Sequence, residues 1–255
     1  VLGDRAEMLA TATVSTYLNI PIAHIHGGEV SSTVDEPVRH AITKLAHLHF
    51  VATTESAHRI QKMGERKDNI FIVGAPGLDA LKAPLPTLAE LNKIYSLQLT
   101  QPYIIILQHP VTQELNQAPK QMQITLEAVK DFRLPTLIIY PNADAGGRQM
   151  IKVINQYRKT KWFNIFPHIS HQHFLGFLKY AAVLVGNSSA GLIEAPSLKL
   201  PVVNIGTRQQ GRQKTINVIE VDYNKNQIAK AIQQALFDKK FITRVKHCQN
   251  PYGQG

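Results

Sequence analysis

Titratable residues follow two apolar stretches near the start of the chain. Asp4 follows the first stretch and Gly3, His26 ends the second stretch, and Glu29 comes three residues later. Imidazole and carboxylate groups are common general acids and bases in enzymes, because their pKa values can be tuned towards neutral pH. His24 and His26 alternate along one predicted strand and so face opposite sides, which lets at most one of them point into a given site. These side chains predict proton-transfer chemistry in the first part of the chain.

Asp35 and Arg5 each have two interpretations. Asp35 is a further carboxylate for acid–base catalysis, but it also begins a helical pattern with Pro37 in its first turn, and the local pattern favours a helix cap. Arg5 suits either a phosphate or a neighbouring carboxylate. Asp4, beside Gly3 at a predicted strand end, has no capping pattern and is the stronger catalytic candidate.

Residues 186–191, Gly-Asn-Ser-Ser-Ala-Gly, are the best candidate for a phosphate site. They join a predicted strand to a helix with small residues, so backbone N–H groups and the hydroxyls of Ser188 and Ser189 can reach an anion. A plain serine helix cap explains the same residues equally well. The chain has no GxxxxGK[ST] loop, and its only G-x-G is at residues 253–255, so P-loop and dinucleotide fingerprints are absent.

Two further side chains could contact a ligand in the second part. His109 lies between a predicted strand and Pro110, where it could contact phosphate or shuttle a proton, although a buried structural histidine is the alternative. Glu194 lies about one turn into the helix after the serine loop, where it could bind a ribose or complement the helix N-terminus.

The remaining histidines predict no metal site. Three are closely spaced, yet their spacing fits no standard zinc pattern and no carboxylate is near them in sequence; these are His168, His171 and His173. Four others are expected on helices or at the surface, namely His40, His47, His49 and His58.

Composition limits the class of protein. The 255 residues are 44% hydrophobic and 18% charged, which indicates a packed globular chain of one large or two ordinary domains. The formal charge of +10 is spread without a run of five or six like charges, so an anionic small ligand explains it better than nucleic acid. No apolar run of 18 residues exists, and the single Cys248 fits a reducing compartment, so we expect a cytoplasmic protein without a membrane span.

Apolar runs and helical periods alternate along the chain, which is typical of parallel α/β architecture. The first part predicts strands at 1–2, 21–26, 50–52 and 70–73 and helices at 6–18 and 55–63. A further helix is predicted to begin at residue 35, and its apolar face extends to residue 49. A connector with a short helix is expected at 80–100. The second part predicts strands at 103–107, 136–140, 162–166, 183–185, 201–205 and 218–221, and helices at 120–132, 148–158, 173–180, 190–197 and 227–237.

Polar residues follow the predicted strands in both parts. Because ligands of parallel sheets bind at the carboxyl ends of the strands, a cleft between two domains is expected. In the second part these residues include Asn142, Asp144 and Arg208.

Six stretches, in one order from residue 3 to about 212, carry a resemblance. They are GDRAEMLAT, HIHGGEVSSTVDEPVRHAITKLAHLHF, LQHPVT, PNADAG, GNSSAGLIEAP and GTRQQGR. They resemble the hydrolysing UDP-N-acetylglucosamine 2-epimerases of bacterial sialic acid synthesis and the epimerase half of the animal bifunctional enzyme. The resemblance implies a GT-B-like α/β fold of two doubly wound, Rossmann-like domains. Residues 1–79 would form the end of an incomplete first domain, 80–240 the UDP-binding domain, and 241–255 a tail returning toward the first.

The resemblance also implies a reaction that needs no cofactor. UDP-N-acetylglucosamine and water would give N-acetylmannosamine and UDP, by elimination of UDP and hydration of the glycal, as the first step of sialic acid synthesis. By motif matching, the catalytic residues would be Asp4, His26, Asp35 and His109. UDP would be bound by Arg5, Ser188, Ser189, Gly191, Glu194 and Arg208, and substrate-loop candidates are Glu29, Asn142 and Asp144. The complete protein is expected to be a homodimer or homotetramer.

Two departures from the family pattern matter. Many sialic-acid members have Glu where this chain has His26, and the HIHGGE form is also similar to relatives that act on UDP-2,4-diacetamido-2,4,6-trideoxyglucose for legionaminic acid. The leading strands and Gly-Thr-Arg loop of the family have no counterpart here, so part of the nucleotide site is expected to be missing and the chain alone to be inactive. Other possibilities are a GT-B glycosyltransferase and a basic nucleic-acid binder.

Overall fold

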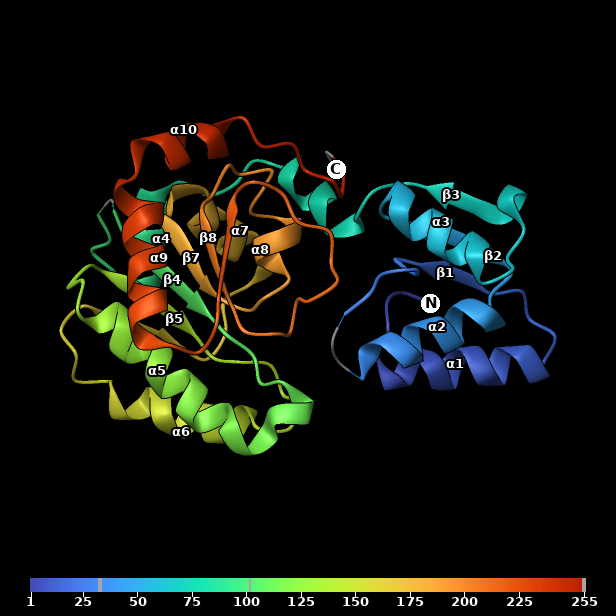
Figure 1. The fold of residues 1–255 in the computed structure, drawn as a ribbon, viewed down its shortest axis with the longest axis horizontal. Coiled ribbons are helices and arrows are strands. Elements are labelled where there is room, and N and C mark those ends of the chain that lie inside the picture. Colours follow the sequence, from blue (N-terminus) through green and yellow to red (C-terminus); the bar gives the residue numbers. More distant parts are fainter. Residues whose placement is uncertain (32–33, 101, 254–255) are drawn as a thin grey trace. The chain divides into compact units, whose positions relative to one another are not determined.

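The computed structural model describes residues 1–31, 34–100 and 102–253. The chain divides into two compact units, each built on its own parallel sheet (Figure 1). The first unit contains residues 1–82 together with 210–213 and 250–253, and the second contains 83–209 and 214–249. In the described part of the chain, no helix has the length and apolar character that a membrane crossing requires.

The sheet of the first unit has the order β1-β2-β3, with all pairs parallel. Its strands are β1 (Ala23–Ile25), β2 (Leu48–Val51) and β3 (Ile70–Ile72). The strand predicted at residues 1–2 is reduced to an isolated parallel bridge between Leu2 and Ile25, in which the Ile25 N–H donates to the Val1 carbonyl at 2.9 Å and the Gly3 N–H donates to the Ile25 carbonyl at 3.0 Å.

Helices α1 (Ala6–Tyr17) and α2 (Asp35–Leu45) pack together below the sheet in Figure 1. Ala12, Ile22 and Ile42 form the buried centre of this layer. The third helix, α3 (Thr54–Lys62), begins at Thr53, whose hydroxyl accepts a hydrogen bond from the Ser56 N–H at 3.1 Å. Two short 3-10 helices follow at Lys67–Asn69 and Pro76–Leu81.

Two local predictions on α2 are wrong. The N-cap is Val34, and Asp35 is the first helical residue, so capping by Asp35 does not occur. The helix ends at Leu45 because Ala46 is extended, with φ −86° and ψ 153°. His49 therefore does not continue the helix face; it lies buried in β2.

The second unit confirms the doubly wound prediction. Its sheet has the order β6-β5-β4-β7-β8-β9. The chain adds β5 and β6 on one side of β4 and then β7, β8 and β9 on the other, so the winding reverses between β4 and β7. The six predicted strands are β4 (Ile104–Leu107), β5 (Thr136–Ile139), β6 (Phe163–Phe166), β7 (Val183–Gly186), β8 (Val202–Ile205) and β9 (Val218–Val221). β4, β5, β7 and β8 are buried along their whole length, which explains why their sequences are almost entirely apolar; the exceptions are Thr136 in β5 and Asn204 in β8.

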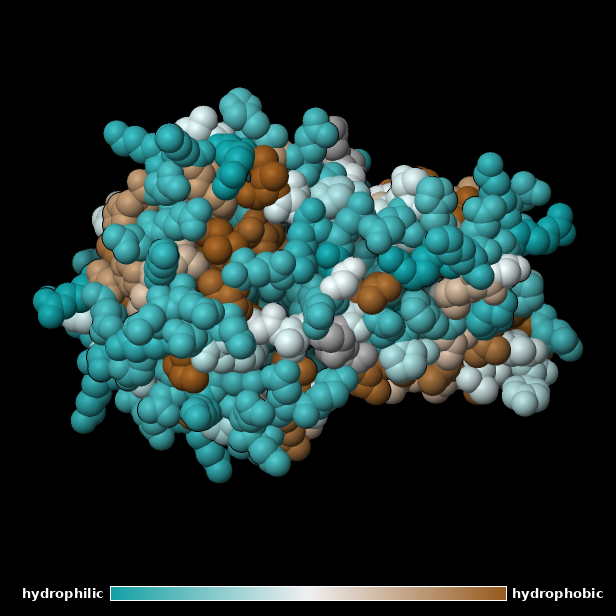
Figure 2. All heavy atoms as spheres, viewed as in Figure 1, coloured by the Kyte–Doolittle hydropathy of each residue, from teal (hydrophilic) through white to brown (hydrophobic). Residues whose placement is uncertain are grey.

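Helices cover this sheet and fix its loops. The set comprises α4 (Leu88–Tyr95), α5 (Ala118–Lys130), α6 (Gly147–Gln156), α7 (His171–Tyr180), α8 (Ala190–Ile193), α9 (Lys225–Phe237) and α10 (Lys239–Lys246), with a 3-10 turn at Thr112–Gln117. Met122 and Leu126 of α5 and Ile232 of α9 belong to the main core. α8 is shorter than predicted, and α10 was not predicted. On the face drawn in Figure 2, hydrophilic residues cover most of the surface.

Candidate active site

The carboxylate of Asp4 is held by a buried arginine from α2. Arg39 is 1% exposed, and its Nε donates to Asp4 Oδ2 at 3.0 Å, with a second donation from Nη2 to the same oxygen. Its Nη1 donates to the backbone oxygen of Glu29 at 2.8 Å. The Arg39 guanidinium, 35 residues from Asp4 in the sequence, thus ties Asp4 to the backbone of the loop that carries His26 and Glu29.

The buried His24 holds the backbone next to Asp4. Its Nε2 lies 2.9 Å from the carbonyl oxygen of Gly3 and its Nδ1 lies 3.1 Å from Thr43 Oγ1. Because a carbonyl only accepts, Nε2 carries the proton in the neutral ring. The Thr43 hydroxyl beside Nδ1 donates to the Arg39 carbonyl at 3.1 Å. Burial lowers the pKa of His24 to about 4, so the ring is neutral at pH 7 and fixes the residue before Asp4.

His26 and Glu29 lie in one tight loop after β1. His26 has φ +66°, in the left-handed region that side chains rarely adopt. Its Nε2 lies 4.0 Å from Glu29 Oε2, and His26 and Glu29 are 17% and 4% exposed. Burial lowers the pKa of His26, while the Glu29 carboxylate opposes that shift. His26 is therefore neutral at pH 7 and able to accept a proton.

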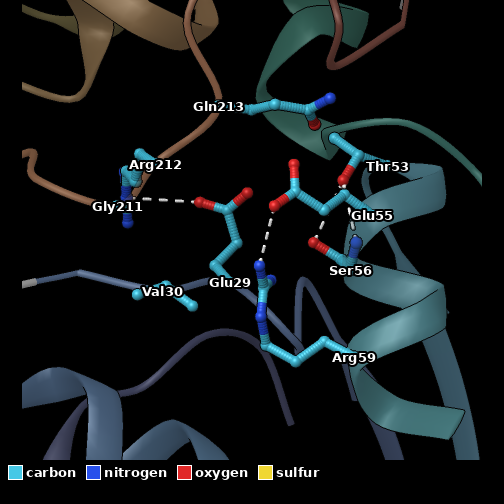
Figure 3. Close-up of a pocket in the computed structure, with 9 residues that line it drawn as sticks. All are labelled: Glu29, Val30, Thr53, Glu55, Ser56, Arg59, Gly211, Arg212 and Gln213. Atoms are coloured by element: carbon cyan, nitrogen blue, oxygen red, sulfur yellow. Dashed lines mark hydrogen bonds and ion pairs between the residues drawn. The ribbon is translucent and has the colours of Figure 1, made fainter. Parts of the chain in front are cut away.

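Glu29 lines a small polar pocket of the first unit (Figure 3). The pocket also has Thr53, Ser56 and Arg59 from the start of α3 and residues 211–213 in its wall. Arg212 Nε lies 3.2 Å from Glu29 Oε2, and Figure 3 shows this pair beside a second pair between Glu55 and Arg59. The pocket is thus lined by two carboxylates and two guanidinium groups.

The other predicted residues of the first unit lie at helix starts. Arg5 is the exposed N-cap residue of α1, and Asp35 is half-buried in the first turn of α2. The neighbouring Glu36 accepts from the Ser31 N–H at 2.6 Å. Residues 32 and 33, which precede α2, lie outside the described residues.

In the second unit, the residues that follow β4 and β7 meet where the winding of the sheet reverses. The His109 N–H donates to Asn187 Oδ1 at 2.7 Å, and Asn187 Nδ2 donates to the His109 carbonyl at 2.9 Å. The Asn187 carbonyl accepts from Arg208 Nη1 at 3.2 Å and from Gln209 Nε2 at 2.8 Å. The predicted residues His109 and Arg208 are therefore joined through a buried asparagine.

The ring of His109 is held in a defined tautomer. Its Nδ1 accepts from the Asn142 N–H at 3.0 Å, so in the neutral ring the proton is on Nε2, which can donate to a ligand. Burial, and secondarily the charge of Arg208, lower the pKa of His109 to about 3. Asn142 Nδ2 donates to Asp144 Oδ2 at 2.5 Å, so this predicted pair lies next to the His109 ring.

The serine turn begins with a close approach of two strands. Gly186 has φ +139°, and a Cβ there would lie 2.1 Å from the Leu107 carbonyl oxygen, so only glycine fits. Ser188 Oγ accepts from the Ala190 N–H at 3.3 Å. Ser189 is the N-cap residue of α8, but its side chain makes no capping hydrogen bond. Gly191 is buried in that helix.

Glu194 follows α8 and is largely buried. Its Oε1 lies 3.9 Å from His171 Nε2, and the contact with Glu194 raises the pKa of His171. Among the described residues, Glu194 Oε2 is buried without a hydrogen-bond partner. A buried acceptor of this kind suits a ligand hydroxyl.

Three site residues were not predicted from the sequence. Arg39 resembles an ordinary charged helix residue, and only its burial after folding distinguishes it. Arg212 and Tyr252 belong to segments far along the chain that pack in the first unit, where the Tyr252 hydroxyl donates to the carbonyl of the pocket residue Gln213 at 3.1 Å. In contrast, Asn187 was visible as a polar residue directly after a predicted strand.

Comparison with sequence families places these features in context. The family model described as UDP-N-acetylglucosamine 2-epimerase matches residues 1–255. The chain is 41% identical to a UDP-N,N'-diacetylbacillosamine 2-epimerase (hydrolyzing) of Legionella pneumophila, covering 100% of this chain and 67% of that protein. It is 40% identical to a UDP-N-acetylglucosamine 2-epimerase of Neisseria meningitidis, covering 94% and 63%. It is 37% identical to the polysialic acid biosynthesis protein P7 of Escherichia coli, covering 99% and 65%.

Solved structures share the fold. The UDP-GlcNAc 2-epimerase of Neisseria meningitidis bound to UDP-GlcNAc has a TM-score of 0.81 at 17% identity, covering 100% of this chain and 72% of that one. The S. aureus MnaA–UDP co-structure has a TM-score of 0.80 at 18% identity, covering 99% and 69%. At these identities the likeness shows the fold, a GT-B-like pair of Rossmann-like units.

Proposed function

Because the chain belongs to the UDP-N-acetylglucosamine 2-epimerase family, we propose that the full-length protein containing it is a hydrolysing 2-epimerase. The proposed reaction converts UDP-N-acetylglucosamine and water into N-acetylmannosamine and UDP. The names of relatives that include hydrolysing enzymes and a polysialic acid biosynthesis protein support this proposal.

The proposed chemistry begins with elimination. A base takes the proton from C2 of the sugar, the C2 electron pair forms a C1–C2 double bond, and the C1–oxygen bond breaks with release of UDP. Water then adds its hydroxyl to C1 while C2 receives a proton on the opposite face. Each half of the reaction needs a group that gives or takes one proton at C2.

One observation carries this proposal in the first unit. Arg39 binds both the Asp4 carboxylate and the backbone of Glu29, so it holds one acid–base group beside the loop that carries His26. His26 is neutral at pH 7 because burial lowers its pKa, and a neutral imidazole can take the C2 proton. We assign Asp4, His26 and Asp35 to the proton transfers.

The second unit would receive the nucleotide. A neutral His109 can donate its Nε2 proton in a hydrogen bond to a diphosphate oxygen, and Arg208 adds a positive charge near it. The buried Oε2 of Glu194 would accept from a ribose hydroxyl. Ser188 and Ser189 would bind phosphate. These interactions favour departure of UDP because they stabilise the charge that develops on the leaving group.

A second substrate is favoured by one residue. The sialic-acid type of this family often has Glu at the position of His26, and the relative that is 41% identical is named for UDP-N,N'-diacetylbacillosamine. That sugar is a 2,4-diacetamido-2,4,6-trideoxyglucose, and its C1 and C2 chemistry is the same. The alternative therefore changes the C4 and C6 substituents and leaves the proton transfers unchanged.

Turnover in deuterated water tests both versions. The full-length protein is given either donor, UDP release is measured by chromatography, and the sugar is examined by NMR. We expect free 2-epimerised sugar with deuterium at C2, and loss of both signals in Asp4→Asn. Retention of the C2 proton would contradict the elimination, and transfer to an added acceptor without free sugar would indicate a glycosyltransferase. His26→Glu should shift the ratio of the two turnovers.

A further inference from the structure

The loop of His26 and Glu29 is fixed from both sides. Arg39 holds the backbone oxygen of Glu29 at 2.8 Å, and Arg59 donates to the backbone oxygen of Gly28. Gly28 has φ +76°, and a Cβ there would lie 2.6 Å from the Ser56 carbonyl oxygen. The loop therefore has little freedom to move His26 and Glu29 apart.

The Glu29 carboxylate is buried and charged, so its surroundings must compensate it. Arg212 supplies the nearest opposite charge, with Nε 3.2 Å from Oε2. Within the described part of the chain, Oε2 nevertheless accepts no hydrogen bond. The same atom lies 4.0 Å from His26 Nε2, so the atom of Glu29 that lacks a hydrogen bond is the one that approaches the imidazole.

We propose that Glu29 is the positioning residue of His26, which orients the imidazole and sets its proton affinity, with Arg212 holding the carboxylate in place. The proposal deepens the proposed function and rests on it in one respect, because His26 matters for turnover only if it transfers a proton there. The contact itself is independent of the substrate.

The charges around His26 give the proposal a definite sign. Glu29 and Asp4 raise the pKa of His26, whereas burial, Arg212 and Arg39 lower it. Arg39 is already paired with Asp4. The remaining pair has opposite effects on the pKa of His26: Glu29 raises it and Arg212 lowers it. Removal of Glu29 should therefore lower the pKa of His26, and removal of Arg212 should raise it. A carboxylate at position 29 would also raise the pKa of a glutamate at position 26.

Opposite shifts can be measured directly. The full-length protein is labelled with ¹³C-histidine, the His26 signal is identified by its loss in His26→Asn, and its titration is followed by NMR without substrate. We expect a lower His26 pKa in Glu29→Gln and a higher one in Arg212→Gln. The control is Glu55→Gln, because Glu55 lines the same pocket but is 52% exposed and paired with Arg59; it should leave the His26 titration unchanged.

Turnover supplies the second readout. In Glu29→Gln we expect kcat to fall at least about tenfold with KM within about twofold, and the acidic limb of the pH profile to move to lower pH with the His26 titration. Glu29→Asp should recover part of the rate. A purely structural role would lower the amount of folded protein without moving the pH profile.

Each outcome is decisive. An unchanged His26 titration in Glu29→Gln, or shifts of the same sign in Glu29→Gln and Arg212→Gln, overturns the proposal. Opposite shifts in a protein that turns over neither donor sustain the positioning role and refute the proposed function. If Glu29→Gln fails to fold, Glu29→Asp and Arg212→Gln still give the sign of the effect.

Discussion

Asn187 and His109 exchange two hydrogen bonds, with the side chain of the first pairing both backbone groups of the second at 2.7 and 2.9 Å. This pairing lies at the ends of β4 and β7, the neighbouring strands between which the winding of the sheet reverses. The ligand site of a doubly wound sheet forms at that point, so Asn187 fixes the backbone of the residue best placed to meet a ligand.

Asn187→Ala should destabilise the protein by about 2–4 kcal/mol, because it leaves the His109 N–H and carbonyl buried without partners. It should also weaken UDP binding, since the backbone that carries the His109 ring loses its fixed position. Urea unfolding and calorimetric titration with UDP check these effects. The exposed Asn226→Ala is the control, and equal stability of the two variants would contradict the prediction.

Arg39→Met should cost about 3 kcal/mol of folding free energy, because it leaves the Asp4 carboxylate and the Glu29 carbonyl without their donor. Arg39→Lys should not restore the loss, since one ammonium cannot reproduce the planar fork that reaches both acceptors. Chemical unfolding measures both. Arg66→Met is the matched control: Arg66 is 80% exposed, and its loss should change stability by less than about 0.5 kcal/mol.

Stability should fall in acid through two buried histidines. Burial lowers the pKa of His109 to about 3 and that of His24 to about 4, from 6.5. The unfolded chain binds these protons as the pH falls below about 6.5, but the folded chain binds them only near pH 3–4. The stabilisation is therefore complete above pH 6.5 and is lost as the pH falls from 6.5 towards 4.

Urea unfolding at a series of pH values tests this dependence. His24→Gln, which can still donate to Gly3, should flatten the curve between pH 6.5 and 4. His109→Gln should do the same. The exposed His58→Gln should leave the slope as in the wild type, and a wild-type slope in both buried variants would refute the argument.

Gly186→Ala should prevent normal folding of the second unit or destabilise it by more than about 3 kcal/mol, since the new Cβ would lie 2.1 Å from the Leu107 carbonyl. Gly64→Ala is the control, because it introduces a side chain at a positive φ without a steric clash. Gly64 also has a positive φ, +93°, but nothing lies within 4 Å of its Cβ position, so about 1 kcal/mol is expected. Thermal melts of the two variants give the comparison.

The sequence predicted strands better than helix ends. All six strands of the second unit were predicted. β4 and β7 are short, buried apolar runs, and β6, β8 and β9 each keep three apolar residues around one polar residue. α10 was missed among its lysines, although Asp238 caps it and Phe241 and Val245 give it a buried face. His49 was misplaced because its spacing continued the α2 face, and spacing carries no sign of the break at Ala46.

For the site, residues at strand ends were predictable and partners from distant segments were not. His109 follows a strand in the sequence itself, so topology alone nominates it. Arg39 becomes distinctive only when α2 packs and brings it to Asp4. Arg212 has no local signal, because its partner Glu29 is defined by the fold of the first unit.

The first unit is not a continuous stretch of the chain. Residues 210–213 and 250–253 belong to it, and the Ala75 N–H donates to the Tyr252 carbonyl at 2.8 Å. During synthesis on the ribosome, residues 1–82 emerge long before these partners. The first unit therefore cannot form completely until nearly the whole of the second unit has been translated. Until then Glu29 is without the charge of Arg212. A protein fragment that ends after residue 82 would always lack Arg212 and the segment of Tyr252.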